Sequence, residues 1–135
     1  EEYNLFMKIC AISPVKVQKR VLGSYRVYEE SLTNRHIKNW AAERFITLDY
    51  LKINHEELFK DNKAIFEQAF MRGDYYKSRY LFSEGRIFEG RQVLRKRALK
   101  STHFFLLYLL SFSNIAWKLV HQRKFKNLIS KYFNF

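Results

Sequence analysis

Residues 56–72 read EELFKDNKAIFEQAFMR, and the spacing of their apolar side chains decides the fold class. Phe59, Phe66 and Phe70 recur at intervals of seven and four residues, and Leu58 and Ile65 are also seven residues apart. Intervals of this kind place side chains on one face of an α-helix. The stretch therefore predicts a helix over 56–72.

Helical patterns continue from this stretch toward the C-terminus. Gly73 is expected to stop the helix and Asp74 to cap the next one, because glycine favours helix ends and aspartate favours helix starts. The ranges 75–84 and 86–100 then predict a helical hairpin that is broken near Gly85.

The pattern is less uniform toward the N-terminus. Residues 2–12 predict a short helix, and Ser31 or Thr33 is expected to cap a long helix that runs to about Lys52. Between them, 15–28 predicts two short extended pieces, the only strand-like part of the sequence. The expected fold class is mainly α, with helical hairpins or a bundle after a short N-terminal helix and two short strands.

The composition limits the classes of protein that this chain can represent. Its 135 residues suit one compact domain, and its 47% hydrophobic content excludes intrinsic disorder. The single cysteine, Cys10, excludes a disulfide framework and fits a reducing compartment. The four histidines lack the spacing of metal ligands, so we expect no metal site in this chain. The chain begins at Glu1 without a methionine, and we expect it to be a piece of a longer protein.

The basic residues are concentrated in the last third of the sequence. Residues 1–85 hold 14 Lys and Arg against 12 Asp and Glu, whereas 86–135 hold 11 Lys and Arg against the single acid Glu89. Such an asymmetry predicts a polyanionic partner for this third. An anionic membrane surface, a nucleic acid and the acidic face of a partner protein are the three candidates.

A run without charged residues lies inside this basic third, at 101–117. As one helix it would measure about 25 Å, which is shorter than the bilayer core of about 30 Å. One stripe of this segment and its C-terminal flank is polar: His103, Ser111, Asn114, Lys118 and Gln122. The opposite stripe is apolar: Phe105, Tyr108, Leu109, Phe112, Ala116 and Leu119. A helix lying in the membrane interface over 101–131 fits this pattern. A terminal helix packed on the preceding hairpins is the alternative.

The surface expected to contact a membrane or a partner combines the apolar stripe with its basic flanks. Its predicted members are Arg95, Lys96, Arg97, Lys100, Phe105, Tyr108, Phe112, Trp117, Lys118, Arg123 and Lys124. An exposed apolar face on 104–119 would also allow the chain to form a homo-oligomer. Nucleic acid is the less favoured partner, because the apolar run 104–115 contains no basic residue to follow a phosphate backbone.

Two motifs near the N-terminus resemble the end of the catalytic domain in family-2 bacterial glycosyltransferases of the GT-A type. Residues 1–11 read EEYNLFMKICA, where those enzymes have an acidic pair, an aromatic residue and an amphipathic helix. Residues 25–33 read YRVYEESLT, where they have Y-R-x-H-x-x-S-x-T. The resemblance implies that 1–30 end a catalytic domain and that 31–135 form a helical C-terminal region.

In such enzymes the second acid of the pair is the general base, and the resemblance assigns this role to Glu2. The parent chain would then be an inverting glycosyltransferase of the hexosyltransferase type. Periodicity alone offers another interpretation, in which Glu1 and Glu2 are first-turn acids that complement the helix dipole.

The resemblance also implies substrate-binding roles for Glu1, Tyr25 and Arg26. Arg26 would contact the diphosphate of a nucleotide-sugar donor through its guanidinium group. An ion pair with Glu29 or Glu30 is the structural alternative for this side chain. The family's histidine is replaced by Tyr28, so no metal contact is expected here.

The expected ligands follow from the same resemblance. The parent enzyme would use a nucleotide-sugar donor, a divalent metal (Mg or Mn) and a glycan or lipid-linked acceptor in surface polysaccharide synthesis. The donor and the metal would be bound mostly upstream of Glu1, so no cofactor is expected in this chain and the chain alone should be inactive. The basic helical region would hold the enzyme at the cytoplasmic face of the plasma membrane.

Overall fold

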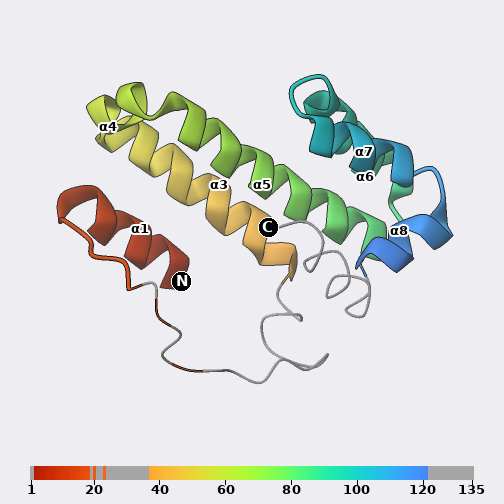
Figure 1. Cartoon of the computed structure of the whole chain (residues 1–135), viewed down its shortest axis with the longest axis horizontal. Coiled ribbons are helices and arrows are strands. Elements are labelled where there is room, and N and C mark those ends of the chain that lie inside the picture. Colours follow the sequence, from red (N-terminus) through yellow and green to blue (C-terminus); the bar gives the residue numbers. More distant parts are fainter. Residues whose placement is uncertain (1, 19, 21–22, 24–36, 122–135) are drawn as a thin grey trace.

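In the computed structural model, the residues whose placement is described are 2–18, 20, 23 and 37–121. They form helices and connecting turns, and this part of the chain contains no strand. The mainly α fold class is therefore confirmed. In chain order the helices are α1 (Glu2–Ile12), α3 (Ile37–Asn54), α4 (Glu56–Asp61), α5 (Lys63–Ser83), α6 (Ile87–Ala98), α7 (Thr102–Leu110) and α8 (Asn114–His121) (Figure 1).

The long helices α3 and α5 lie side by side and form the centre of the structure (Figure 1). The short helix α4 connects them at one end, and α1 packs against α3 at the same end. The helices α6, α7 and α8 gather around the other half of α5. The described helices thus form two groups that share α5.

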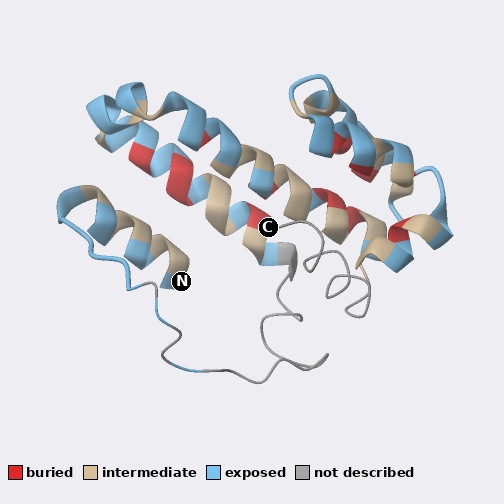
Figure 2. Cartoon of the chain, in the orientation of Figure 1, coloured by how far each residue is buried: buried red, intermediate tan, exposed pale blue. Residues whose placement is uncertain are grey.

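Each group has its own hydrophobic core. The first core contains the buried side chains of Leu48, Leu51 and Phe66, and α1 contributes Met7 and Ala11 to its edge. The second core contains the buried side chains of Leu94, Phe104, Leu107 and Trp117, with Met71 and Tyr75 of α5 packed against it. Figure 2 shows the buried segments along the contact of α3 with α5 and again on α6 to α8.

The predicted break at Gly73 and Asp74 is wrong, because α5 continues through both residues. Gly73 instead allows α3 to lie close to α5, because a Cβ atom at this position would lie 2.7 Å from Cε1 of Phe45. The absence of a side chain therefore lets α5 and α3 come together at this point. The 56–72 prediction needs a second correction, since α4 ends at Asp61 and α5 begins at Lys63.

Other predicted boundaries agree with the structure. The N-terminal helix spans Glu2–Ile12 as expected, and α3 ends at Asn54, two residues beyond the prediction. The hairpin between α5 and α6 breaks at Gly85, whose φ of 75° is in the region that favours glycine. The predicted caps Ser31 and Thr33 lie outside the described residues.

The first of the two predicted extended pieces forms no strand. Val15 and Val17 are exposed and belong to neither a helix nor a strand. A short extended piece needs a neighbouring strand for its backbone hydrogen bonds, and none is found in the described part of the chain. The second predicted piece, 21–28, lies outside the described residues except for Gly23.

The single amphipathic helix predicted for the uncharged run is also wrong. The run forms two helices, α7 and α8, which are separated by a turn at 111–113. Arg91 stabilises this turn, because its Nε and Nη2 atoms donate to the carbonyl oxygen of Ser111 at 3.1 and 2.8 Å. Ser113 accepts a hydrogen bond from the backbone N–H of Ala116 on its Oγ atom (3.2 Å) and thereby caps the start of α8.

The buried side of this run differs from the predicted stripes in part. Phe104, Leu107 and Ser111 are buried against the rest of the protein, although Ser111 belongs to the predicted polar stripe. The predicted apolar stripe is largely exposed, as the side chains of Phe105 and Leu109 show. Because α7 is apolar nearly all round, packing against α6 decides which of its faces is buried.

Candidate functional site

The predicted base, Glu2, lies exposed in the first turn of α1. The other predicted substrate-binding residues, Glu1, Tyr25 and Arg26, lie outside the described residues. Of these four residues, the structure describes only Glu2, which is the first residue of α1. The position of α1 is set by its packing against α3.

One side of α1 is fastened to α3 by polar contacts. The amide Nδ2 of Asn4 donates to Oγ1 of the buried Thr47 (2.9 Å), whose hydroxyl donates in turn to the carbonyl oxygen of Glu43 (2.7 Å). Lys8 Nζ lies 4.2 Å from the centre of the Tyr50 ring. These contacts fix the rotation of α1 about its own axis.

Tyr3, the neighbour of Glu2, is held by Arg44 of α3. Arg44 Nη1 donates to the phenolic oxygen at 3.0 Å, and the guanidinium carbon lies 4.4 Å from the ring centre. Burial raises the pKa of Tyr3, and the positive charges of Arg44 and Arg72 partly offset this increase. Tyr3 therefore stays protonated at neutral pH and fixes the helix start that carries Glu2.

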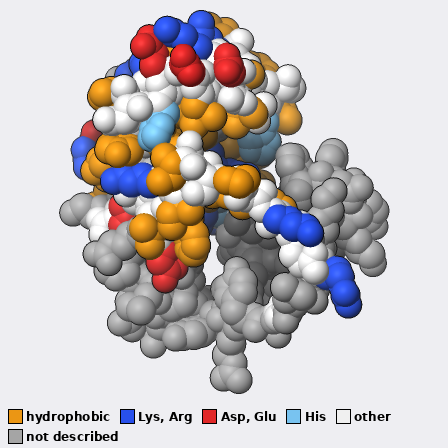
Figure 3. All heavy atoms as spheres, turned by 90° about the vertical axis from the view of Figure 1, so that its left-hand side faces the viewer, with side chains coloured by type: hydrophobic (Ala, Val, Ile, Leu, Met, Phe, Trp, Pro, Cys, Tyr) orange, Lys and Arg blue, Asp and Glu red, His pale blue; other side chains and the backbone are white. Residues whose placement is uncertain are grey.

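The opposite side of α1 is apolar and exposed. Leu5, Phe6, Ile9 and Ile12 expose large parts of their side chains, although Leu5, Phe6 and Ile9 recur at the spacing of a helix face. Figure 3 shows hydrophobic side chains in the middle of this end of the molecule, where α1 and α4 lie, with charged side chains at its upper edge. The helix thus uses its more polar side for packing and leaves its more apolar side open.

The predicted membrane or partner surface separates into three groups in the structure. Its exposed members are Arg95, Lys96, Lys100, Phe105, Phe112 and Lys118. Tyr108 is half-buried, and Trp117 is buried in the second core, so its assignment to the surface is wrong. Arg123 and Lys124 lie outside the described residues.

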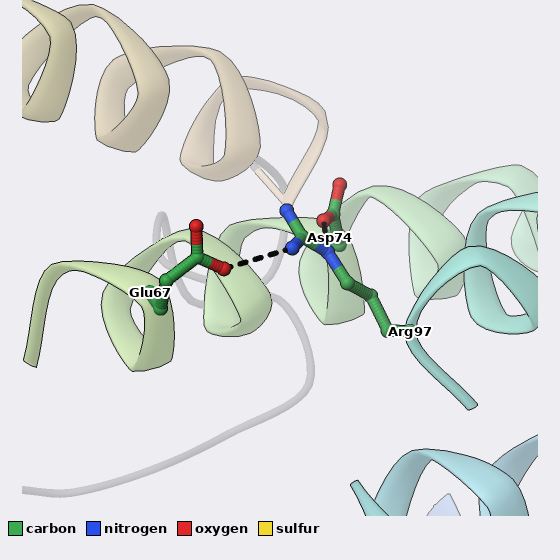
Figure 4. A network of polar contacts seen from close by, with 3 residues as sticks. All are labelled: Glu67, Asp74 and Arg97. Atoms are coloured by element: carbon green, nitrogen blue, oxygen red, sulfur yellow. Dashed lines mark hydrogen bonds and ion pairs between the residues drawn. The ribbon is translucent and has the colours of Figure 1, made fainter. Parts of the chain in front are cut away.

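Arg97 is also not part of a free basic surface. Its Nε atom donates to Oδ2 of Asp74 at 2.6 Å, and its Nη1 atom lies 3.1 Å from Oε2 of Glu67 (Figure 4). The Arg97 and Asp74 side chains are only about one-fifth exposed. Arg97 therefore joins α6 to the middle of α5, and its charge is neutralised within the protein.

The exposed apolar part of α7 forms a ridge, which we define by Phe105, Leu106, Leu109 and Phe112. The guanidinium carbon of Arg91 lies 4.6 Å from the centre of the Phe112 ring, at the end of this ridge. Sequence reasoning missed the role of Arg91, because its two partners, the Ser111 carbonyl and the Phe112 ring, lie about twenty residues away in the sequence.

A cavity of about 290 Å³ lies between the C-terminal half of α5 and α8. Arg79 and Lys118 supply its positive charges, Ser83 and Asn114 supply neutral polar groups, and Phe82 and Trp117 supply aromatic walls. Lys118 and Trp117 were identified from the sequence, but the residues of α5 were missed because their proximity to α8 depends on how the chain folds back after Gly85.

Comparisons of the chain with protein families, with curated proteins and with solved structures find no match. Within the described ranges, no three His, Cys, Asp or Glu side chains are grouped so that they could hold a metal ion. No helix in the same part of the chain has both the length and the apolar character needed to cross a bilayer.

Proposed function

We propose that this chain is the C-terminal part of an inverting nucleotide-sugar glycosyltransferase, in which Glu2 is the general base. The observation that carries the proposal is the helix that begins at Glu2, with this carboxylate exposed in its first turn. Tyr3 and Asn4 fix the helix to α3, so that Glu2 extends from a supported position toward solvent.

The proposed reaction uses the carboxylate as a proton acceptor. Glu2 removes the proton from an acceptor hydroxyl while the oxygen attacks the anomeric carbon of the donor sugar. The bond between this carbon and the diphosphate breaks, and the nucleoside diphosphate leaves with the bonding electrons. Attack from the side opposite the leaving group inverts the configuration at the anomeric carbon.

The open apolar side of α1 supports the proposal that this helix ends a larger domain. Leu5, Phe6, Ile9 and Ile12 would be costly to leave in water, and a stripe of this kind marks a contact surface. In the proposed parent enzyme, the catalytic domain upstream of Glu1 covers this stripe and places the donor sugar near Glu2.

The divalent metal implied by the resemblance does not fit the described residues. Among the residues that the structure describes, Glu2 belongs to no group of three or more His, Cys, Asp or Glu side chains that could hold a metal ion. The metal and most of the donor site therefore belong to other parts of the proposed enzyme, and Glu2 acts only on the acceptor hydroxyl.

Transfer activity of the complete gene product that contains this chain tests the proposed function. We expect release of nucleoside diphosphate from a nucleotide sugar to require a glycan or lipid-linked acceptor, and the product to have an inverted anomeric configuration. A panel of nucleotide sugars with extracts of surface glycans and lipid-linked acceptors provides the substrates. Absence of transfer with every pair in the panel would contradict the proposal.

The helical region would hold this enzyme at an anionic membrane on its cytoplasmic side. The α7 ridge supplies an exposed apolar surface, and Arg95 and Lys96 on the neighbouring helix α6 supply exposed positive charges. Apolar residues enter the interface while Lys and Arg remain at the headgroups, each adding about 1 kcal/mol of attraction.

Replacing Phe105 and Leu109 together by Ser is expected to weaken binding to anionic vesicles by about tenfold or more, since two apolar side chains no longer enter the lipid. Both side chains are exposed, so the fold should be retained. Vesicle flotation measures the effect, and replacement of Ile53 and Ile65 by Ser, two even more exposed residues on α3 and α5, is the control. Equal binding by both double variants would refute the role of the ridge.

A further inference from the structure

The cavity between α5 and α8 has the charge of an anion site. Arg79 from α5 and Lys118 from α8 line it, and none of the lining residues within the described ranges is acidic. Ser83 and Asn114 add a hydroxyl and an amide that are able to donate hydrogen bonds. Two cations with additional donors match the several oxygens of a phosphate group.

The position of the Arg79 guanidinium is restrained on one side of the cavity. Its guanidinium carbon lies 5.8 Å from the centre of the Tyr75 ring, and Tyr75 is itself packed against the second core. Burial raises the pKa of Tyr75, so its ring is neutral at physiological pH and leaves the charge of Arg79 available to a ligand. A restrained guanidinium loses less conformational entropy when it binds an anion.

Aromatic rings form part of the cavity wall, and exposed apolar side chains lie next to the lining residues of α8. The rings of Phe82 and Trp117 lie with their centres 4.2 Å apart. Ile115 and Leu119, one turn apart on α8, are exposed beside the lining residues Asn114 and Lys118. Phe112, at the end of the α7 ridge, precedes the same helix and is also exposed. Phe112, Ile115 and Leu119 thus offer exposed apolar side chains that are close in sequence to lining residues of the cationic cavity.

We propose that this cavity binds the terminal phosphate of an anionic lipid, whose hydrocarbon chains lie along Phe112, Ile115 and Leu119. The inference rests on the membrane docking proposed above and adds a headgroup site to it. The volume of about 290 Å³ is at the lower end of small-molecule sites. It suits a phosphate with its first carbon atoms better than an entire nucleotide sugar.

The charge and the apolar flank together favour a lipid over a soluble phosphate. A soluble ligand gains nothing from Ile115 and Leu119, whereas a lipid buries both side chains when its phosphate enters the cavity. A terminal phosphate is also more highly charged than the phosphodiester of other anionic lipids. The site therefore predicts selectivity for phosphatidic acid over phosphatidylserine.

Vesicle flotation of the full chain tests this selectivity. Phosphatidylcholine vesicles that contain either phosphatidic acid or phosphatidylserine are compared at equal surface charge. We expect about tenfold tighter binding to phosphatidic acid, since two cations gain charge-assisted hydrogen bonds. Lys118→Gln should remove most of this preference, and Lys77→Gln, an exposed lysine of α5 outside the cavity, should retain it.

Asn114→Asp provides a second variant that leaves the fold intact. An acid at the first residue of α8 is favourable for the helix dipole, yet it places a negative charge in the cavity. The preference for phosphatidic acid should therefore disappear without loss of helical content by circular dichroism. An unchanged preference in both Asn114→Asp and Lys118→Gln would overturn the headgroup site.

The remaining outcomes separate this inference from the docking on which it rests. Equal binding to phosphatidic acid and phosphatidylserine would retain the docking and overturn the headgroup site. Absence of binding to any anionic vesicle would overturn both, while transfer activity would still decide the glycosyltransferase proposal. If inorganic phosphate at low concentration abolishes the preference for phosphatidic acid, the ligand of the cavity is a soluble phosphate. That result would overturn the proposal that the ligand is a lipid.

Discussion

Glu2→Gln is expected to lower the transfer rate of the complete gene product by about 10²- to 10⁴-fold, the usual contribution of a general base. The amide has nearly the same shape as the carboxylate but cannot accept the proton of the acceptor hydroxyl. The loss should appear in kcat, with little change in the KM for the nucleotide sugar, because Glu2 acts on the acceptor. Steady-state kinetics of nucleoside diphosphate release measures both quantities.

Two further variants control this result. Glu57→Gln removes another exposed acid in the first turn of a helix, in α4, and should leave the rate unchanged. Glu2→Asp keeps a carboxylate and should retain part of the activity. Since Glu2 is exposed, none of these changes should alter the free energy of unfolding by more than about 0.5 kcal/mol. Equal activity of Glu2→Gln and the unmodified enzyme would exclude Glu2 as the base.

Leu94→Ala is expected to have the largest effect on stability, a loss of about 2 to 5 kcal/mol in the free energy of unfolding. The Leu94 side chain is 0% exposed and lies in the second core with Phe104, Leu107 and Trp117. Its truncation removes apolar contacts from three helices and leaves a cavity that the surrounding helices fill only partly. Urea denaturation followed by tryptophan fluorescence measures the change.

Leu99→Ala is a matched control five residues further along the chain. The Leu99 side chain is 97% exposed, so the same chemical change should alter the free energy of unfolding by less than about 0.5 kcal/mol. Similar losses in the two variants would mean that Leu94 does not occupy a packed core.

The sequence predicts the helices well where local signals decide their limits. The range of α1 and the break at Gly85 agree with the structure, since helical periodicity and a glycine with positive φ are local properties. The error at Gly73 has a long-range cause. The same residue type that ends a helix also permits close packing, and only the position of Phe45 decides which role applies.

The two helices nearest the proposed functional surfaces show why their buried faces could not be predicted. In α1 the side with Tyr3 and Asn4 faces the protein, while Leu5 and Phe6 face outward. A rule that buries the most apolar face fails here, because polar partners on α3 determine the rotation of α1. In α7 nearly every residue is apolar, so periodicity carries no information about the buried side.

The candidate site was predictable only in part. Glu2 and Lys118 were identified from the sequence, through a motif and through local charge. Arg79 and Ser83 were missed because their relation to α8 depends on how the chain folds back after Gly85. The two helices that form the cavity are about thirty residues apart in the sequence, from Ser83 to Asn114. No local pattern of residues therefore reveals the cavity.

The continuity of α5 has a consequence for the geometry of the proposed enzyme at a lipid surface. Its 21 residues extend through both cores, over a length of about 32 Å. Docking through α7 and α8 would therefore hold the start of α1 at a constant height above the headgroups. Acceptors whose reactive hydroxyl projects to that height would meet Glu2, and shorter or longer ones would miss it.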